Sequence, residues 1–370
     1  MPEPAILVLD DANRLVEIVT HHEVEDARVE HLEGILTPGF VNSHCHLELS
    51  HLKGHIPKLT GLPEFAKHVI LLRNKISLEE KMEHMRQAEL EMWNNGTVAV
   101  GDISNGPESF ELKAGSKLFY HTFIELIGLQ PKNAEALFEN GLNLFRQLEP
   151  QQLAGSLAPH APYSTSKELI QKIARYNQTH QLSFSIHNQE SDEETKFLQG
   201  EKNEFEALYQ FLGLDTTWFS PSGLSSLKYY SDVLASNAPS LLVHNTVTKA
   251  ADVAVTLEKA VYWCFCPEAN LYIEGRLPDL QLFKGLEQRI CIGTDSLASN
   301  SHLDLIQEAN NLLIAGAPFS LETLLRAITW NGAEALGISD HFGRLCPGKN
   351  VGLNWIDFKD SQLHFIKKIT

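Results

Sequence analysis

Histidine and aspartate residues that could bind a metal ion follow several apolar runs of this 370-residue chain. His44 and His46 come directly after the run from Pro38 to Ser43. In a β-strand alternate side chains project to the same face, so these two imidazoles could grip one metal ion. Four later apolar runs are each followed by one ionisable residue: His160, His187, His244 and Asp295. All of these residues can act together only if the fold brings the ends of the runs to one place.

Short β-branched runs alternate with longer segments of helical period through most of the chain, which is typical of a parallel sheet with crossover helices. Capping residues precede three of the expected helices, at Ser77, Thr165 and Ser320. Eight strands with intervening helices predict an α/β fold of the (β/α)8 TIM-barrel type. The expected strands are Gly39–Ser43, Thr97–Ile103, Leu118–Ile127, Ala154–Pro159, Leu182–Ile186, Ser240–Val243, Ala260–Phe265 and Arg289–Gly293.

In such a barrel the strand ends meet at one mouth, where barrel active sites lie. Three imidazoles and one carboxylate suit one divalent metal ion, with zinc favoured over iron. Water on that ion would ionise near neutral pH and supply hydroxide. Glu190, three residues after His187, could carry the proton that a leaving amine needs. Any single histidine of the set could instead be a buried structural residue, and the neighbouring acidic residues Asp192, Glu193 and Glu194 fit a solvated helix start.

The two ends of the chain do not follow the alternating pattern. Short apolar runs at Ile6–Leu9 and Leu15–Val19 resemble antiparallel strands, and the tail contains two more at Val351–Ile356 and Leu363–Ile369. Because chain ends often lie close together, these runs could pair into a small β-sandwich domain. We therefore expect residues 1–37 and 343–370 to build one small β domain beside a barrel of residues 38–342.

The interval from Glu190 to Pro239 is too long for a simple crossover between two strands. An excursion of this length commonly covers a site, and a plain insertion is the alternative.

Acidic residues outnumber basic ones, with 47 Asp and Glu against 30 Lys and Arg, and the net charge is −17. That sign disfavours binding to nucleic acid or to an anionic membrane surface. The five cysteines are odd in number and lie mostly in apolar runs, so buried thiols in a reducing, cytoplasmic location are expected. Neither a basic leader nor an apolar run of about 18 residues occurs, so we expect no membrane span. The expected partner is a small molecule, and assembly into a homo-oligomer is left open.

Seven short motifs lie at or just beyond the ends of the expected strands: Pro38-Gly-Phe-Val-Asn-Ser-His-Cys-His-Leu47, Pro159-His-Ala-Pro-Tyr163, His187-Asn-Gln-Glu190, Val243-His-Asn245, Cys266-Pro-Glu-Ala-Asn270, Gly293-Thr-Asp-Ser296 and Ser299-Asn300. In this order they resemble the amidohydrolase superfamily, and most closely its branch of cyclic-amidine and nucleobase deaminases and related chlorohydrolases. The resemblance extends from about Ile35 to Gly348. The segment Leu47-Glu-Leu-Ser50 is similar to a subgroup that includes aminodeoxyfutalosine deaminases.

The resemblance implies a role for each of these positions. His244 would orient the attacking water, Asp295 would accept its proton, and Glu190 would protonate the ring nitrogen and assist the leaving amine. His160 would hydrogen-bond the substrate, or alternatively only fix its own loop. The implied ligands of one metal ion are His44, His46, His187 and Asp295.

The expected reaction is hydrolytic deamination of an amino-substituted heterocycle or nucleoside through hydroxide on the metal. Dechlorination or cyclic-amide hydrolysis by the same site is the first alternative, and an inactive barrel that serves as a binding protein is the second. An inactive chain should lack a ligand or the proton carrier, whereas this chain retains each of them. Asn188 and Gln189 depart from the apolar or small residues that often precede the glutamate, but neither is an implied ligand.

Overall fold

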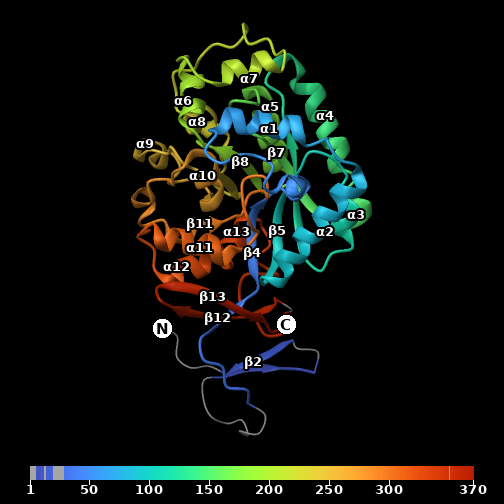
Figure 1. The fold of residues 1–370 in the computed structure, drawn as a ribbon, viewed down its shortest axis with the longest axis vertical. Helices are drawn as coiled ribbons and strands as arrows, with labels where there is room; N and C mark the ends of the chain where they lie inside the picture. The colour runs from blue at the N-terminus through green and yellow to red at the C-terminus, as the bar shows by residue number, and fades with distance from the viewer. Residues whose placement is uncertain (1–5, 12–13, 20–28, 350) are drawn as a thin grey trace.

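Two four-stranded parallel sheets form the centre of the molecule (Figure 1). The structure is a computed structural model that describes residues 6–11, 14–19, 29–349 and 351–370. All eight strands expected from the sequence are present, with ends shifted by at most two residues, and the α/β architecture is confirmed. In sheet order they are β4 (Phe40–Cys45), β5 (Thr97–Ser104), β6 (Phe119–Leu126) and β7 (Ala154–Pro159), then β8 (Phe184–Asn188), β9 (Ser240–His244), β10 (Val261–Phe265) and β11 (Ile290–Ile292).

Backbone hydrogen bonds join the two sheets along both edges. Between β7 and β8 the His187 amide donates to the His160 carbonyl at 2.9 Å. Between β11 and β4 the amides of Thr294 and Asp295 both donate to the His44 carbonyl, at 3.0 and 3.1 Å. Gly293 permits this close approach, since a Cβ there would lie 2.7 Å from the His44 carbonyl oxygen. The eight strands therefore form a closed ring whose carboxyl ends share one side.

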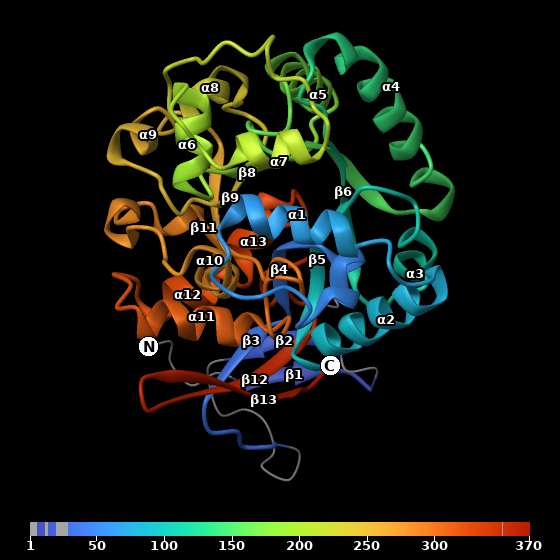
Figure 2. The ribbon, with the colours of Figure 1, turned by 45° about the horizontal axis from the view of Figure 1, so that its top comes forward.

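Helices surround the ring and cover its outer face (Figure 2). The capping box at Ser77 and the cap at Ser320 are confirmed. The expected cap at Thr165 is wrong: Ser166 accepts from the Leu169 amide, and the Thr165 hydroxyl donates to the Leu126 carbonyl. These helices are α2 (Leu78–Asn94), α3 (Phe110–Ala114), α4 (Ala134–Phe145), α5 (Lys167–Thr179), α9 (Ala250–Ala254), α10 (Pro267–Glu274), α11 (Leu305–Ile314), α12 (Leu321–Ala327) and α13 (Trp330–Ala335).

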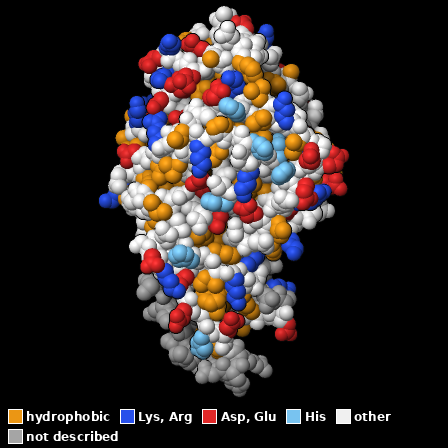
Figure 3. Space-filling view, viewed as in Figure 1, with side chains coloured by type: hydrophobic (Ala, Val, Ile, Leu, Met, Phe, Trp, Pro, Cys, Tyr) orange, Lys and Arg blue, Asp and Glu red, His pale blue; other side chains and the backbone are white. Residues whose placement is uncertain are grey.

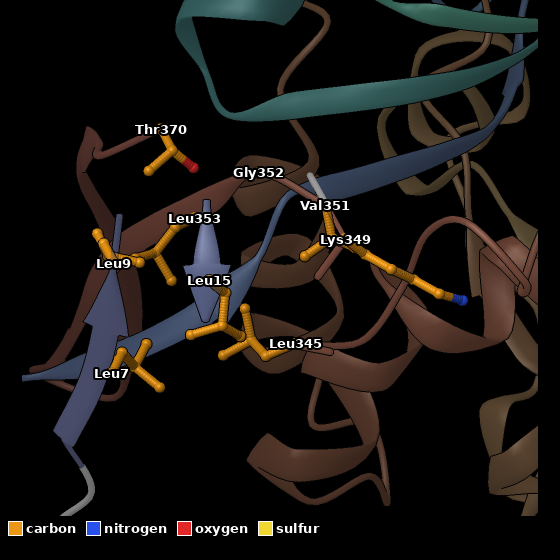
Figure 4. Close-up of a pocket in the computed structure, with 9 residues that line it drawn as sticks. All are labelled: Leu7, Leu9, Leu15, Leu345, Lys349, Val351, Gly352, Leu353 and Thr370. Atoms are coloured by element: carbon orange, nitrogen blue, oxygen red, sulfur yellow. The ribbon is translucent and has the colours of Figure 1, made fainter. Parts of the chain in front are cut away.

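Strands from both chain ends share one antiparallel sheet, in the order β13 (Gln362–Lys368), β12 (Leu353–Lys359), β3 (Ile35–Pro38). The sequence did not predict β3, which is only four residues long. The pair β1 (Ile6–Leu9) and β2 (Leu15–Val19) forms a separate antiparallel sheet, as expected. Figure 4 shows leucines of this pair beside Leu353, around a small apolar pocket. The strands β1 to β3 therefore lie beside those of the C-terminal segment, while their arrangement as a sandwich stays a prediction.

The long interval after Glu190 folds into α6 (Asp192–Gln199), α7 (Phe205–Phe211) and α8 (Ser226–Tyr230), which lie with α1 (Leu62–Leu72) at the end of the molecule opposite the terminal sheet (Figures 1 and 2). Phe205 stacks on Tyr163 at 4.3 Å between ring centres, and the Tyr209 hydroxyl donates to the Tyr163 carbonyl at 2.6 Å. The interval therefore packs on the loop that follows β7. Within the described ranges, none of the helices is long and apolar enough to cross a membrane.

The side chain of Asn310 fixes the terminal sheet to α11, because it donates to the Leu363 carbonyl at 2.9 Å and accepts from the Leu363 amide at 2.8 Å. We expect Asn310→Ala to lower the free energy of unfolding by about 1–3 kcal/mol, since it leaves two buried backbone groups unpaired. Urea denaturation measures this change. Asn143→Ala, on the exposed side of α4, is the matched control, and an equal effect of both variants would contradict the proposed anchoring.

Candidate metal centre

The four side chains implied as metal ligands converge on one point at the mouth of the ring. The His46 Nε2 atom lies 3.1 Å from Nε2 of His44 and 3.2 Å from Nε2 of His187. Oδ1 of Asp295 lies 3.4 Å from the His46 Nε2 atom and 3.6 Å from that of His44. Two of these groups come from β4 and the residue after it, one comes from β8, and one comes from the segment that follows β11.

A β-bulge shapes the segment that carries two of these histidines. Asn42 pairs with Val100, and the next pair is Cys45 with Asp102, so three steps along β4 oppose two along β5. A bulge bends its strand and re-aims the side chains. The sequence predicted a regular strand here; the imidazoles do meet, but on irregular backbone.

Hydrogen bonds at the outer nitrogen fix how His187 and His244 face the centre. Nδ1 of His187 lies 2.9 Å from the His160 carbonyl oxygen, which only accepts, so Nδ1 carries the proton. Nδ1 of His244 donates in the same way to Oδ1 of Asn270 at 3.0 Å, and the Asn270 amide nitrogen donates to the His244 carbonyl. In the neutral rings Nε2 then carries no proton, and its lone pair is available to bind a metal ion.

The spacing of the ring nitrogens fits a cation between them. Because Nε2 of His46 lies 3.1 Å and 3.2 Å from those of His44 and His187, the three atoms cannot all carry protons, and their lone pairs repel one another in a buried site. Two nitrogens that each lie about 2.0–2.1 Å from one zinc ion would be separated by about 3–3.5 Å. The donor set of three imidazoles and one carboxylate therefore matches a borderline divalent metal in both chemistry and spacing.

Burial sets the charge of these groups. It lowers the pKa of His46 and His187 well below the usual range and that of His244 to about 4. Burial acts in the opposite direction on Asp295, but electrostatic interactions with His44, His46 and His244 hold the Asp295 pKa below its usual value. The imidazoles of His46, His187 and His244 are thus neutral beside the carboxylate anion of Asp295.

Left-handed backbone marks the strand ends around this centre. Gln189, His244, Asn245 and Asp295 have φ angles of +48°, +74°, +62° and +54°, which non-glycine residues rarely adopt. Each costs about 1–3 kcal/mol, and such residues concentrate at functional sites. Asn245 offsets part of this cost, because its side chain donates to the carbonyls of Leu242 and Cys264.

Glu190 lies beside the centre, with Oε1 3.6 Å from Nε2 of His244. Burial raises the pKa of Glu190 well above its usual value, and the charges of Asp295, Glu194 and Glu274 add to this shift. A carboxyl group that stays protonated near neutral pH can donate a proton. The expected proton carrier is therefore close to the implied ligands and has a suitable charge state.

The side chain of Glu194 holds the backbone of Glu190 by a hydrogen bond. Its Oε2 accepts from the Glu190 amide at 2.9 Å, and its Oε1 accepts from the Ser226 hydroxyl. We expected Glu194 in a solvated helix start, and this was wrong: α6 does begin at Asp192, but Glu194 is fully buried. The reason is that one side of the first turn of α6 packs against α8. Only the acidic residues on the other side of that turn reach water.

His160 lies next to the implied ligands, with its ring centre 4.8 Å from that of His187. The Ser164 hydroxyl donates to the Ala161 carbonyl and so accepts from Nδ1 of His160, at 2.5 Å. Nε2 of His160 is left as an acceptor. A loop-fixing contact and a free acceptor atom coexist on one ring, so the two roles considered for His160 do not exclude each other.

Sequence reasoning missed Glu125 and Asn105, at the ends of β6 and β5. Glu125 Oε1 lies 3.6 Å from Nδ1 of His187, and Asn105 donates to Glu125 Oε2 at 2.8 Å. The signal was a glutamate inside the apolar run of an expected strand. The departures Asn188 and Gln189 also have a structural use: the Tyr230 hydroxyl donates to Asn188 at 2.6 Å, which ties α8 to β8.

Charged side chains of both signs are exposed on the surface. Acidic and basic side chains are interspersed on the face shown in Figure 3, without one continuous basic area. The cysteines of the described chain are free, and four of the five are buried, as expected.

Comparisons with known proteins agree with the geometry. The profile of the amidohydrolase family matches residues 35–369. Aminodeoxyfutalosine deaminase of Nitratiruptor sp. is 26% identical over 93% of this chain and 86% of its own, and adenosine deaminase of Helicobacter pylori is 28% identical over 88% and 80%. The crystal structure of H. pylori aminofutalosine deaminase in complex with methylthio-coformycin superimposes with a TM-score of 0.80 at 26% identity, over 96% of this chain and 87% of that one.

The buried carboxyl of Glu194 makes stability depend on pH. Burial raises its pKa to about 7, so between pH 4.5 and 7 the folded chain keeps a proton that the unfolded chain releases, and stability falls as pH rises. Glu194→Gln has no such titration. We expect the free energy of unfolding of the variant, relative to that of wild type, to rise by up to about 3 kcal/mol from pH 4 to pH 8. Urea denaturation across this range tests this, with the exposed Glu206→Gln as control; parallel curves would contradict it.

Proposed function

Because the chain belongs to the amidohydrolase family, we propose that it hydrolyses the exocyclic C–N bond of an adenine-type nucleoside and releases ammonia. The family and its deaminase relatives confirm the expected class, an enzyme that acts on C–N bonds. The observation that carries the proposal is that a three-histidine, one-aspartate cluster and a buried glutamate lie together at the mouth of the ring.

In this proposal His44, His46, His187 and Asp295 hold one divalent metal ion. Zinc is favoured, with iron as the alternative, because the donor set is borderline and the nitrogen spacing suits zinc–nitrogen bonds of ordinary length. When bound, such an ion supplies the Lewis acidity that makes water reactive near neutral pH. The related adenosine deaminase of Xanthomonas campestris was crystallised with zinc.

The chain's own side chains move and hold the protons. Glu190, protonated in its buried position, delivers a proton to the ring nitrogen next to the attacked carbon. His244 presents Nε2 as an acceptor, and Asn270 keeps that tautomer in place. Asp295 accepts from the Ser299 hydroxyl through Oδ2 at 2.5 Å, which leaves Oδ1 to face the reacting groups. His160 presents Nε2 to a hydrogen-bond donor of the substrate.

The adenine-type substrate rests on the relatives, whose names are adenosine deaminase, aminodeoxyfutalosine deaminase and 5'-deoxyadenosine deaminase. A panel of adenosine, aminodeoxyfutalosine and 5'-deoxyadenosine, with an amino- and a chlorotriazine for contrast, tests the reaction through release of ammonia or chloride. Ammonia from an adenine nucleoside is expected. Chloride without ammonia would favour the dechlorinating alternative and overturn the proposal.

We also propose the domain division 1–37, 38–342 and 343–370, with a (β/α)8 barrel beside a small β-sandwich made from both ends. Support comes from the hydrogen-bonded closure of the ring and from the shared sheet of β3, β12 and β13. A cytoplasmic location belongs to the same proposal, since free buried thiols suit a reducing compartment.

Metal removal tests the ligand set. We expect about one equivalent of metal in the purified protein, and chelation should lower both the Tm and ammonia release, because an ion that binds only the folded state stabilises it. His187→Ala should lose the metal, as measured by elemental analysis. His180→Ala, at the exposed end of α5, is the control and should retain it. Full metal content in His187→Ala would contradict the assignment.

Glu190→Gln separates proton transfer from metal binding. The variant should lower kcat by about 10²- to 10⁴-fold, because the amide cannot deliver a proton, while the bound metal stays near one equivalent. Asp192→Asn, on the exposed first turn of α6, is the neighbouring control. If Glu190→Gln instead lost its metal, Glu190 would be a ligand and the assigned roles would be wrong.

A further inference from the structure

A fully buried ion pair lies beside the segment that carries His44 and His46, outside the ligand set. Nζ of Lys113, on α3, is 2.6 Å from Oδ2 of Asp102, on β5, and both side chains have no exposed surface. Oδ1 of Asp102 accepts from the amide of Leu47 at 2.8 Å. The carboxylate thus connects the lysine to the first peptide group after His46.

The bulge explains why this contact is needed. It interrupts the regular pairing of β4 with β5 between Asn42 and Cys45, and β4 ends at Cys45. The Leu47 amide therefore lies beyond the strand ladder. A side-chain oxygen of Asp102 supplies the acceptor, and a hydrogen bond to an ionised carboxylate is stronger than one to a neutral group.

Lysine 113 keeps that acceptor ionised and in place. Burial raises the pKa of Asp102, and the charge and hydrogen bond of Lys113 counteract the shift. Nζ also donates to the hydroxyls of Ser104, at 2.8 Å, and Thr122, at 3.3 Å, so β5 and β6 both fix its position. The rings of Phe110 and Tyr120 enclose the ammonium group.

The opposite side of β4 has its own fixed contact. The Asn42 amide donates to the Thr294 hydroxyl at 2.8 Å and accepts from the Thr294 amide at 3.1 Å. This pair fixes the His44 side of the motif to the segment that follows β11. The contact of Asp102 with Leu47 is its counterpart on the His46 side, so both histidines are held between two anchors.

We propose that Asp102 and Lys113 are positioning residues that set the place of His46 in the metal centre. This inference rests on the proposed function only through the metal ion. Fold stability alone does not call for a charged pair here, since buried ion pairs contribute little more than well-packed apolar residues of similar volume. A purely structural pair could therefore be replaced by apolar residues without loss of metal affinity, whereas a positioning pair could not.

The test compares two double variants, Asp102→Leu with Lys113→Met and Asp102→Asn with Lys113→Met. Neither leaves an unpaired buried charge, but only the second keeps an acceptor for the Leu47 amide. We expect the first to raise the Kd for zinc, measured by chelator competition, by about 10- to 100-fold, and to lower kcat more than it raises KM. The second should recover most of the zinc affinity, because its amide oxygen still accepts from Leu47 and, being neutral, does not need the lysine that keeps the Asp102 carboxylate ionised. The surface pair Glu135→Gln with Lys172→Met is the control.

Wild-type zinc affinity in the Asp102→Leu, Lys113→Met protein would overturn the inference while the proposed function stands. Absence of zinc binding by the wild-type chain would instead overturn the proposed function. Amide hydrogen exchange needs no variant and applies even if a double variant does not fold. The Leu47 amide of the metal-free wild type should exchange as slowly as the amides of β4, and exchange at the rate of an open loop would also overturn the inference.

Discussion

The His44 carbonyl oxygen is the contact on which the site depends. It accepts from the amides of both Thr294 and Asp295, and this pair of bonds closes the ring between β11 and β4. The same bonds bring the Asp295 carboxylate to within 3.6 Å of the His44 ring. The hydrogen bonds that close the ring thus also complete the four-residue cluster. Gly293 permits them, because a larger residue would collide with β4.

Exclusion of water gives the buried groups their chemical character. Burial disfavours the charged forms of His46, His187, His244 and Glu190, so these three imidazoles stay neutral and the Glu190 carboxyl stays protonated. Asp295 is the exception, because its electrostatic interactions with His44, His46 and His244 stabilise its anion. One physical cause therefore yields unprotonated nitrogens and a proton carrier side by side, and the neighbouring imidazoles decide which carboxyl stays ionised.

The sequence predicted the parts of the fold that depend on short-range patterns. Strand positions follow from β-branched runs, and ionisable residues at the ends of parallel strands must meet if the strands form one ring. It could not predict the bulge in β4, the cap at Ser166 or the burial of Glu194, because each depends on packing between distant segments. Lys113 shows the same limit: in the sequence it looks like any helix surface residue, and only α3 packing on β5 and β6 makes it an internal cation.

The centre concentrates features that destabilise a protein locally. Left-handed residues at three strand ends and several buried carboxyl groups each cost free energy. They persist because their neighbours leave no alternative: Asn245 is hydrogen-bonded to two strands, Asn270 holds His244, and Glu194 holds the Glu190 backbone. These holding residues come from β-strand ends and helix starts rather than from flexible loop tips. The hydrogen-bonded closure of the ring is therefore what holds this strained, buried cluster together.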